Sequence, residues 1–363
     1  MKGLYLTFQS ESEINKEDGV CKKIKMQIDS LNKSGLSIYN YNFILPNRYR
    51  NKIFSLFNPY YFTNKVKNDF FNYDFYYIRF PLCSFAFLNL LKYIKKYGKG
   101  KILVEIPTFP YEEEIKGCFF DILNEKLFRN KLKKYVNVFT TYSIDKEIYG
   151  VPALYFKNGI DCTNIPVVDK KLINQNTIHF LAIAIFSIWH GYDRLINGLY
   201  NYYKKNVNKI VYLHLVGDGN QIEYYKNLVN KYNLQKYISF YGFLSGDKLS
   251  EIINKSDVGV CSLGNHRTNI FLSSELKSRE YLASGLPIIS STKIDVLPDD
   301  FKYCLYVPED ESPIDIYSII NFYNKIISEE NITQITANIR QFAEENCDIN
   351  ITMKPVVEYL SKP

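Results

Sequence analysis

The sequence of 363 residues lacks the marks of membrane, secreted and zinc-binding proteins. No stretch approaches the roughly 18 uncharged apolar residues that a membrane-spanning helix needs, and the apolar run at residues 3–8 is too short for a signal-peptide core. The seven cysteines are scattered and form no Cys-x-x-Cys pair, a usage that favours reduced thiols over disulfides or a zinc site. We therefore expect a cytoplasmic protein.

The common catalytic signatures are also missing. The sequence contains no Gly-x-Ser-x-Gly nucleophile motif, no phosphate loop of the P-loop type and no dinucleotide-binding glycine fingerprint. Its four histidines do not cluster with acidic residues at metal-ligand spacing. These absences exclude the common hydrolases and P-loop enzymes, and we expect neither a metal nor a cofactor.

What the sequence does contain is a repeated alternation of apolar strands and amphipathic helices. The chain is too long for one ordinary core and fits two domains. Continuous apolar strands separated by helices predict parallel sheets covered on both faces. The expected strands lie at residues 3–8, 37–45, 75–80, 102–106, 136–141 and 153–156, and then at 178–185, 210–216, 237–241, 258–262, 287–290 and 303–307.

We thus predict an α/β protein with two Rossmann-like, doubly wound domains. The polar, proline-bearing stretch at 164–175 is the expected linker, which puts the first domain at 1–165 and the second at 166–345. The last segment, 346–363, contains a helical stretch that we expect to pack back on the first domain.

The positive charge of the chain is concentrated in its first half. Residues 1–163 contain 25 basic and 16 acidic residues, a net charge of +9, whereas residues 164–363 carry −2. This asymmetry favours an anionic partner such as a membrane surface or a lipid diphosphate, with solvated lysines on helix faces as the alternative. The basic, aromatic segment 46–74 fits a lipid interface or an aromatic core between solvated lysines equally well. No nucleic-acid-binding pattern accompanies the charge, so we expect no nucleic-acid partner.

Three short glycine elements follow expected strands in the second half. They are His190-Gly191, residues 216–219 and residues 241–243. Each places a glycine at the carboxyl end of a strand, where the backbone approaches a ligand or turns sharply. Together they predict a crevice for a nucleoside diphosphate, lined by Gly217, Asp218, Gly219, Gly242 and Phe243.

The stretch 273–290 supplies charged side chains for the same crevice. It is typical of a polar loop, a short helix and a core strand. Glu280 on the helix is suited to bind the two hydroxyls of a ribose, and Lys277, one turn earlier, is suited to bind phosphates beside the helix N-terminus. His190 is a candidate donor to a phosphate oxygen, and Arg194 is either a bidentate phosphate clamp or a solvated charge.

One acidic residue stands out in the first half. Glu105 lies where the expected buried strand 102–106 meets its loop. In a parallel sheet such a strand end opens on the ligand crevice. We therefore predict that Glu105 acts as an acid or base, or binds sugar hydroxyls.

Several of these elements together resemble a known family. The order and spacing of segments 158–161, 216–219, 241–243, 255–263 and 276–289 are similar to those of the retaining glycosyltransferases of family 4. The resemblance implies the GT-B fold, with two Rossmann-like domains facing a central cleft. A nucleotide sugar would be held mainly by the second domain and the acceptor by the first. By the same likeness Glu280 would bind the donor ribose, Lys277 the diphosphate, and His190 would replace the usual phosphate-binding lysine.

The chain departs from the family pattern at several places, among them Ala184-Ile185, which replace the usual Gly-Arg. The Glu-x7-Glu motif requires a first glutamate at the position of Leu272, so the nearest acid, Glu275, becomes the candidate for the usual sugar contact. The first half also lacks the histidine that the family places near the donor sugar, which leaves Glu105, Thr108 or Tyr111 for that space. The predicted catalytic residues are therefore Glu105, His190, Glu275 and Lys277.

The Lys-x-x-Glu-Tyr variant at Lys277 resembles enzymes that build bacterial surface polysaccharides such as capsule and O-antigen. The resemblance implies a metal-independent, retaining glycosyltransferase that moves a sugar from a nucleoside diphosphate sugar to a hydroxyl of a lipid-linked glycan. Such an enzyme would work in the cytoplasm or peripherally at the inner face of the cell membrane. A sugar-nucleotide epimerase or hydrolase of the same fold and a non-catalytic scaffold are the alternatives.

Overall fold

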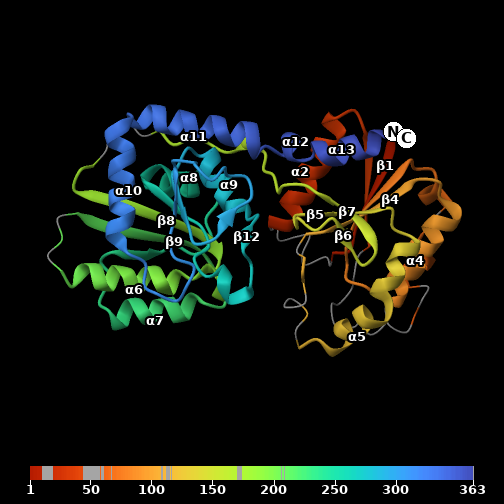
Figure 1. Ribbon diagram of the computed structural model, residues 1–363, viewed down its shortest axis with the longest axis horizontal. Helices are drawn as coiled ribbons and strands as arrows, with labels where there is room; N and C mark the ends of the chain where they lie inside the picture. The colour runs from red at the N-terminus through yellow and green to blue at the C-terminus, as the bar shows by residue number, and fades with distance from the viewer. Residues whose placement is uncertain are drawn as a thin grey trace. The chain divides into compact units, whose positions relative to one another are not determined.

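The computed structural model of the chain describes residues 1–9, 19–43, 58, 61–66, 68–107, 109–111, 115, 117–169, 174–205, 207 and 209–362. It divides into a first unit, Met1–Asn158 with Ile349–Pro363, and a second unit, Gly159–Asp348 (Figure 1). The division comes before the expected boundary at residue 165. The reason is Arg340 of the second unit, which donates to the backbone oxygens of Cys162 and Ile165 at 2.6 and 2.8 Å and so ties this segment to the second unit.

The first unit is built on a seven-stranded sheet with the order β2-β1-β3-β4-β5-β7-β6. Neighbouring strands are parallel except for β6 and β7. Its elements are β1 (Lys2–Thr7), α2 (Gly19–Lys33), β2 (Ser37–Asn42), η1 (Thr63–Lys65), η2 (Asn68–Phe71), β3 (Phe75–Arg79), α4 (Phe85–Tyr97), β4 (Lys101–Ile106), α5 (Phe119–Phe128), η3 (Arg129–Lys134), β5 (Val138–Thr141), β6 (Glu147–Ile148), β7 (Val151–Tyr155), α12 (Ile349–Thr352) and α13 (Lys354–Ser361).

Helices cover both faces of this sheet because alternate strand residues point to opposite sides. Tyr5 and Tyr77 lie on the face that packs against α2, α12 and α13, whereas Leu6 and Ile78 lie on the face that packs against α4 (Figure 1). The segment 349–363 therefore contributes to the core of the first unit.

The second unit contains a six-stranded, fully parallel sheet with the order β10-β9-β8-β11-β13-β15. A short parallel pair, β12 with β14, stands beside it. The elements are η4 (Cys162–Asn164), β8 (Thr177–Ile185), η5 (Ile188–His190), α6 (Tyr192–Tyr203), β9 (Ile210–Asp218), α7 (Ile222–Lys231), β10 (Ile238–Phe240), α8 (Gly246–Lys255), β11 (Val258–Val260), η6 (Asn265–Thr268), β12 (Leu272–Ser273), α9 (Leu276–Ala283), β13 (Ile288–Ser290), β14 (Lys293–Ile294), β15 (Cys304–Tyr306), α10 (Ile316–Glu329) and α11 (Ile332–Asn346).

This sheet is also covered on both faces. Residues of α6, α7 and α10 share one apolar core with the strands, and residues of α8, α9 and α11 share the other. Figure 1 shows α6 and α7 on the opposite side of the sheet from α8, α9 and α11. The continuous apolar strands of the sequence are thus explained by burial from two sides.

The strand order places a topological switch point in the second unit. The first strand of the unit, β8, has β9 on one side and β11 on the other. Because all strands are parallel, their carboxyl ends lie at one edge, and ligands of such sheets bind where the strand order reverses. The ends of β8 and β11 are therefore where a ligand is expected.

Part of the basic, aromatic segment can be placed. Its residues 46–57, 59–60 and 67 lie outside the described residues, while Phe62 and Phe70 are buried in the core that α4 covers. The lipid interface stays a prediction. Within the described ranges, no helix is long and apolar enough to cross a membrane.

Candidate functional site

Two loops meet at the switch point of the second unit. One follows β8 and carries His190, and the other follows β11. They are joined by backbone hydrogen bonds, from Leu263 N to His190 O at 2.9 Å and from Gly264 N to Trp189 O at 3.1 Å. Gly191 has φ 61°, and a Cβ there would lie 2.6 Å from Gly264 N. Only glycine fits this close approach, which fixes His190 at the edge of the sheet.

His190 is a neutral hydrogen-bond donor. Its side chain is mostly enclosed, and burial, followed by the charge of Lys277, lowers the pKa of His190 to about 2. Nδ1 accepts a hydrogen bond from Ser187 N at 2.9 Å, so the ring proton resides on Nε2. No group in the described part of the chain is bonded to Nε2. That N–H is available to a ligand oxygen.

Lys277 and His190 both contact the side chain of Tyr192. Lys277, at the start of α9, has its Nζ 3.1 Å from Tyr192 Oη and 5.4 Å from the centre of the Tyr192 ring. The fully buried Tyr192 ring also stacks on His190, with centroids 5.6 Å apart. Sequence reasoning missed Tyr192. Its place directly after the His190-Gly191 pair was the only available signal.

Glu275 connects the start of α9 to the loop after β11. Its Oε1 accepts from Ser262 N at 3.1 Å and its Oε2 from Ser262 Oγ at 2.6 Å, and Lys277 Nζ lies 3.4 Å from Oε2. The structure therefore brings three of the predicted residues, His190, Glu275 and Lys277, to one edge. Ser262 is a further member that the sequence did not reveal.

Glu280 lies one turn after Lys277 on the same helix. Its side chain is exposed rather than packed in the interior. An exposed carboxylate on α9 is accessible to a ligand, as the predicted ribose contact requires.

The glycine elements of β9 and β10 hold backbones together. Gly217 has φ 121°, and a Cβ there would lie 1.9 Å from Ala184 O. Gly217 N donates to Gly242 O at 2.7 Å. Gly217 therefore serves the close approach of neighbouring strand ends, whereas Gly242 has φ 65° and open space at its Cβ position. The exposed side chains of the same loops are Asp218, which accepts from Gly219 N at 2.8 Å, and Phe243, which is 71% exposed.

Comparison with known proteins identifies the architecture. Residues 177–317 match the glycosyl transferases group 1 family. Sucrose-phosphate synthase from Thermosynechococcus elongatus has a TM-score of 0.67 at 13% identity, with 99% of each chain covered. HepE from Anabaena, solved in complex with UDP, has a TM-score of 0.63 at 14% identity, covering 99% of this chain and 100% of that one. The fold is GT-B.

A third solved structure of the GT-B fold is also similar to the chain. The lipopolysaccharide outer core galactosyltransferase WaaB has a TM-score of 0.60 at 13% identity, covering 99% of this chain and 98% of that one. No curated protein matches the sequence. The predicted α/β fold with two parallel-sheet domains is confirmed, and the group 1 match supports a glycosyltransferase.

Within this GT-B fold, Arg194 is neither a phosphate clamp nor a solvated charge, and both predictions for it are wrong. Its side chain is 1% exposed. The guanidinium donates to backbone oxygens of Ser312 at 2.9 Å and Pro308 at 2.8 Å, and to Leu263 O, and it pairs with Asp310 at 3.3 Å. Arg194 therefore fixes the loop before α10.

Glu105 is placed inside the first unit, out of reach of a substrate. It is 0% exposed. Its Oε2 accepts from Tyr77 Oη at 2.8 Å and Gln27 Nε2 at 3.0 Å. Burial alone would raise the pKa of Glu105, but Lys23 and Arg79 hold it below its ordinary value. The carboxylate is ionised and engaged, so the structure contradicts an acid, base or sugar-binding role.

Tyr111 and Thr108 are the other residues predicted to lie near the donor sugar. Tyr111 is buried, and its Oη donates to Glu125 Oε2 at 2.7 Å, so it is a core residue. Thr108 lies outside the described residues, as do Glu112, Glu113 and Glu114. Across the described ranges, no three His, Cys, Asp or Glu side chains form a group that could hold a metal.

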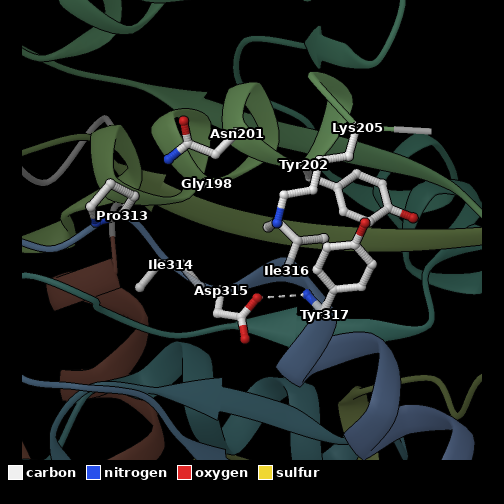
Figure 2. Close-up of a pocket in the computed structure, with 9 residues that line it drawn as sticks. All are labelled: Gly198, Asn201, Tyr202, Lys205, Pro313, Ile314, Asp315, Ile316 and Tyr317. Carbon is white, nitrogen blue, oxygen red and sulfur yellow. Dashed lines mark hydrogen bonds between the residues drawn. The ribbon is translucent and has the colours of Figure 1, made fainter. Parts of the chain in front are cut away.

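A cavity of about 210 Å³ lies elsewhere in the second unit, beside the later half of α6 (Figure 2). Asp315 Oδ1 accepts from Tyr317 N at 3.1 Å on one side of it, and Gly198 and Lys205 of the α6 region lie on the other. The cavity contains none of the predicted site residues and is smaller than the roughly 300–1,000 Å³ of typical ligand pockets. The cavity is therefore separate from the predicted site.

Proposed function

We propose that the protein is a retaining, metal-independent glycosyltransferase of family 4. It would move a sugar from a nucleoside diphosphate sugar to a hydroxyl of a glycan. The observation that carries the proposal is the convergence of His190 and Lys277 on Tyr192, at the switch point of a unit that matches the group 1 glycosyltransferases.

The two side chains suit the chemistry of the donor. When the bond between the anomeric carbon and the diphosphate oxygen breaks, negative charge develops on the departing diphosphate. Lys277 supplies a positive charge and His190 a neutral N–H donor, and fixed donors aimed at developing charge are a major source of rate enhancement. Glu280 is assigned to the ribose hydroxyls and Glu275 to the orientation of Lys277. The UDP bound to HepE supports a nucleoside diphosphate as the ligand class.

The acceptor is proposed to be a lipid-linked glycan of a surface polysaccharide. The net charge of +9 on residues 1–163 suits peripheral contact with an anionic membrane at its inner, cytoplasmic face. The likeness to WaaB, a lipopolysaccharide outer core galactosyltransferase, supports this class of product.

The first test is nucleotide binding by the second unit. A panel of nucleoside diphosphates is titrated by thermal shift and calorimetry against the wild type, Lys277→Met and Glu280→Ala. Because charge-assisted hydrogen bonds are lost, we expect each variant to bind at least about tenfold more weakly. Lys248→Met removes an exposed lysine of the same unit and serves as the matched control, with unchanged affinity.

Turnover separates the proposal from its alternatives. The wild type is incubated with nucleotide sugars, with and without glycan acceptors, and the products are identified by mass spectrometry. Transfer that requires an acceptor supports the proposal. Consumption of donor without acceptor would identify an epimerase or hydrolase, and the absence of any nucleotide-induced stabilisation would identify a scaffold.

A further inference from the structure

The first unit carries a polar cluster that the donor chemistry does not use. On the face covered by α2, alternate residues change from apolar to polar toward the carboxyl edge. Along β3 they are Phe75, Tyr77 and Arg79, and along β4, after Lys101 at its start, Leu103 is followed by Glu105. Because ligands of parallel sheets bind at the carboxyl edge, the polar end of this face lies where a ligand is expected.

Glu105 fixes the geometry of this cluster. Its Oε1 lies 3.2 Å from Arg79 Nη1 and 3.3 Å from Lys23 Nζ. Buried ion pairs contribute little net stability, because the loss of hydration offsets their attraction. Stability alone therefore does not account for a fully buried carboxylate here. A role in holding Arg79 in one orientation accounts for it.

Arg79 is the member of the cluster that reaches the surface from a strand end. Its side chain is 17% exposed, whereas that of Glu105 is fully enclosed. A guanidinium has five N–H donors. Within the described residues, Glu105 accepts a hydrogen bond from one nitrogen of Arg79, and Tyr5 is the only other hydrogen-bond partner of Arg79. Most of the donors of Arg79 are left for a ligand.

The position of Arg79 in the sheet agrees with a binding role. Arg79 is the last residue of β3. Strand β1 has β2 on one side and β3 on the other, so the carboxyl ends of β1 and β3 form the switch point of this sheet. The net charge of +9 on residues 1–163 favours an anionic ligand for this part of the chain.

We propose that Arg79 binds a phosphate or carboxylate group of the sugar acceptor, so that the acceptor is an anion. A planar guanidinium pairs with either group through two parallel hydrogen bonds. The identity of the bound anion as the sugar acceptor rests on the proposed sugar transfer. Anion binding by Arg79 does not depend on that proposal.

The test uses the full-length chain carrying Lys277→Met, which removes the proposed diphosphate contact of the second unit. Methyl phosphate and sodium acetate are titrated separately by calorimetry. The same titrations are followed by NMR at the ¹⁵N-labelled arginine side chains, where the Arg79 Nε–H signal is assigned by its loss in Arg79→Gln. The control is Lys95→Gln, which removes an exposed charge from α4 of the same unit.

We expect the Arg79 signal to shift and saturate with at least one of the two anions. Arg79→Gln should weaken binding at least about tenfold, and Lys95→Gln should leave it unchanged. The anion that binds more tightly identifies the acceptor group as phosphate or carboxylate. An Arg79 signal that neither anion shifts, or a folded Arg79→Gln that binds as well as Lys95→Gln, would overturn the proposal.

Two further arms keep the result unambiguous. If Arg79→Gln does not fold, Arg79→Lys replaces it, since lysine keeps the charge but loses the planar fork, and unchanged affinity in that variant counts against the site. Nucleotide binding is measured in the Arg79→Gln protein with Lys277 restored. Loss of anion binding with intact nucleotide binding shows that the acceptor site is separate from the donor site. Anion binding at Arg79 without any nucleotide binding would contradict only the assignment of the donor site.

Discussion

At the scale of single residues, burial favours the neutral form of His190. His190 has a lowered pKa because its ring is enclosed and Lys277 is near. The imidazole thus stays neutral across the physiological range and works as an N–H donor. Lys277 provides the positive charge.

The lowered pKa of His190 predicts an acid-sensitive contribution to stability. Below its ordinary value of 6.5 the unfolded chain binds a proton that the folded protein does not bind until about pH 2, so stability falls as the pH falls. Between pH 7.5 and 5 the loss from this residue is ~2 kcal/mol. His190→Gln should abolish this loss of stability, which is measured by urea unfolding at pH 7.5 and at pH 5.

His214 gives this comparison an internal reference. Burial lowers the pKa of His214 to about 4, which has the same sign, and His214 is present in both proteins. The difference between wild type and variant therefore reports His190. Equal losses of stability in the two proteins would show that His190 is charged in the folded state.

At the scale of elements, the carboxyl ends of β8, β9 and β10 are held together by backbone contacts. The geometry at Gly217 leaves no room for a side chain because Ala184 O of the neighbouring strand occupies it. The loops after these strands are thus built on a closely packed edge.

Gly217→Ala should be strongly destabilising. The new Cβ would lie 1.9 Å from Ala184 O in a left-handed conformation, so the strands must separate and the backbone is strained. We expect a loss of ~3 kcal/mol or more in the free energy of unfolding, with weaker nucleotide binding. The measurement is denaturant unfolding together with nucleotide titration.

Gly246→Ala is the matched control for Gly217→Ala. Gly246 also has a positive φ, 57°, but nothing lies within 4 Å of its Cβ position. Its cost should be ~1 kcal/mol, from backbone conformation alone. Similar costs for the two variants would mean that contact with β8 does not matter.

At the scale of the whole molecule, the chain leaves the first unit and returns to it. The second unit ends at Asp348, and α12 and α13 complete the core of the first. Met353, Val356 and Leu360 are buried in that core. The last residues of the chain therefore stabilise the unit that contains the first residues.

Met353→Ala should destabilise the first unit by ~2–5 kcal/mol, because it leaves a cavity in a buried cluster. Hydrogen exchange measured by mass spectrometry should show faster exchange in β1 and α2 and unchanged protection in the second unit. Glu358→Ala, at an exposed position of α13, should change neither. Faster exchange spread equally over both units would contradict the division.

Much of the fold could be predicted because its cause is local in the sequence. Continuous apolar strands that alternate with amphipathic helices form parallel sheets covered on both faces, and both units have such sheets. The expected final helix was realised as α12 and α13. The end of a strand allowed His190 to be selected as a candidate, and the start of a short helix allowed Lys277 to be selected.

The roles of charged side chains could not be predicted in the same way. Arg194 and Glu105 stand at strand and helix ends in patterns that indicate a site, yet both are internal. Their partners are remote in the sequence: Ser312 is 118 residues from Arg194, and Gln27 is 78 residues from Glu105. No local pattern reports contacts of that range.

The sequence by itself determined the alternation of strands and helices, the two sheets and the glycines at strand ends, because hydrophobic periodicity and backbone conformation act over a few residues. Only the tertiary structure decided which charged side chains are buried in the core and which lie at a sheet edge, and it revealed Tyr192 between His190 and Lys277. The physical reason is that hydration and hydrogen-bond partners depend on what folding brings close, not on what is adjacent along the chain.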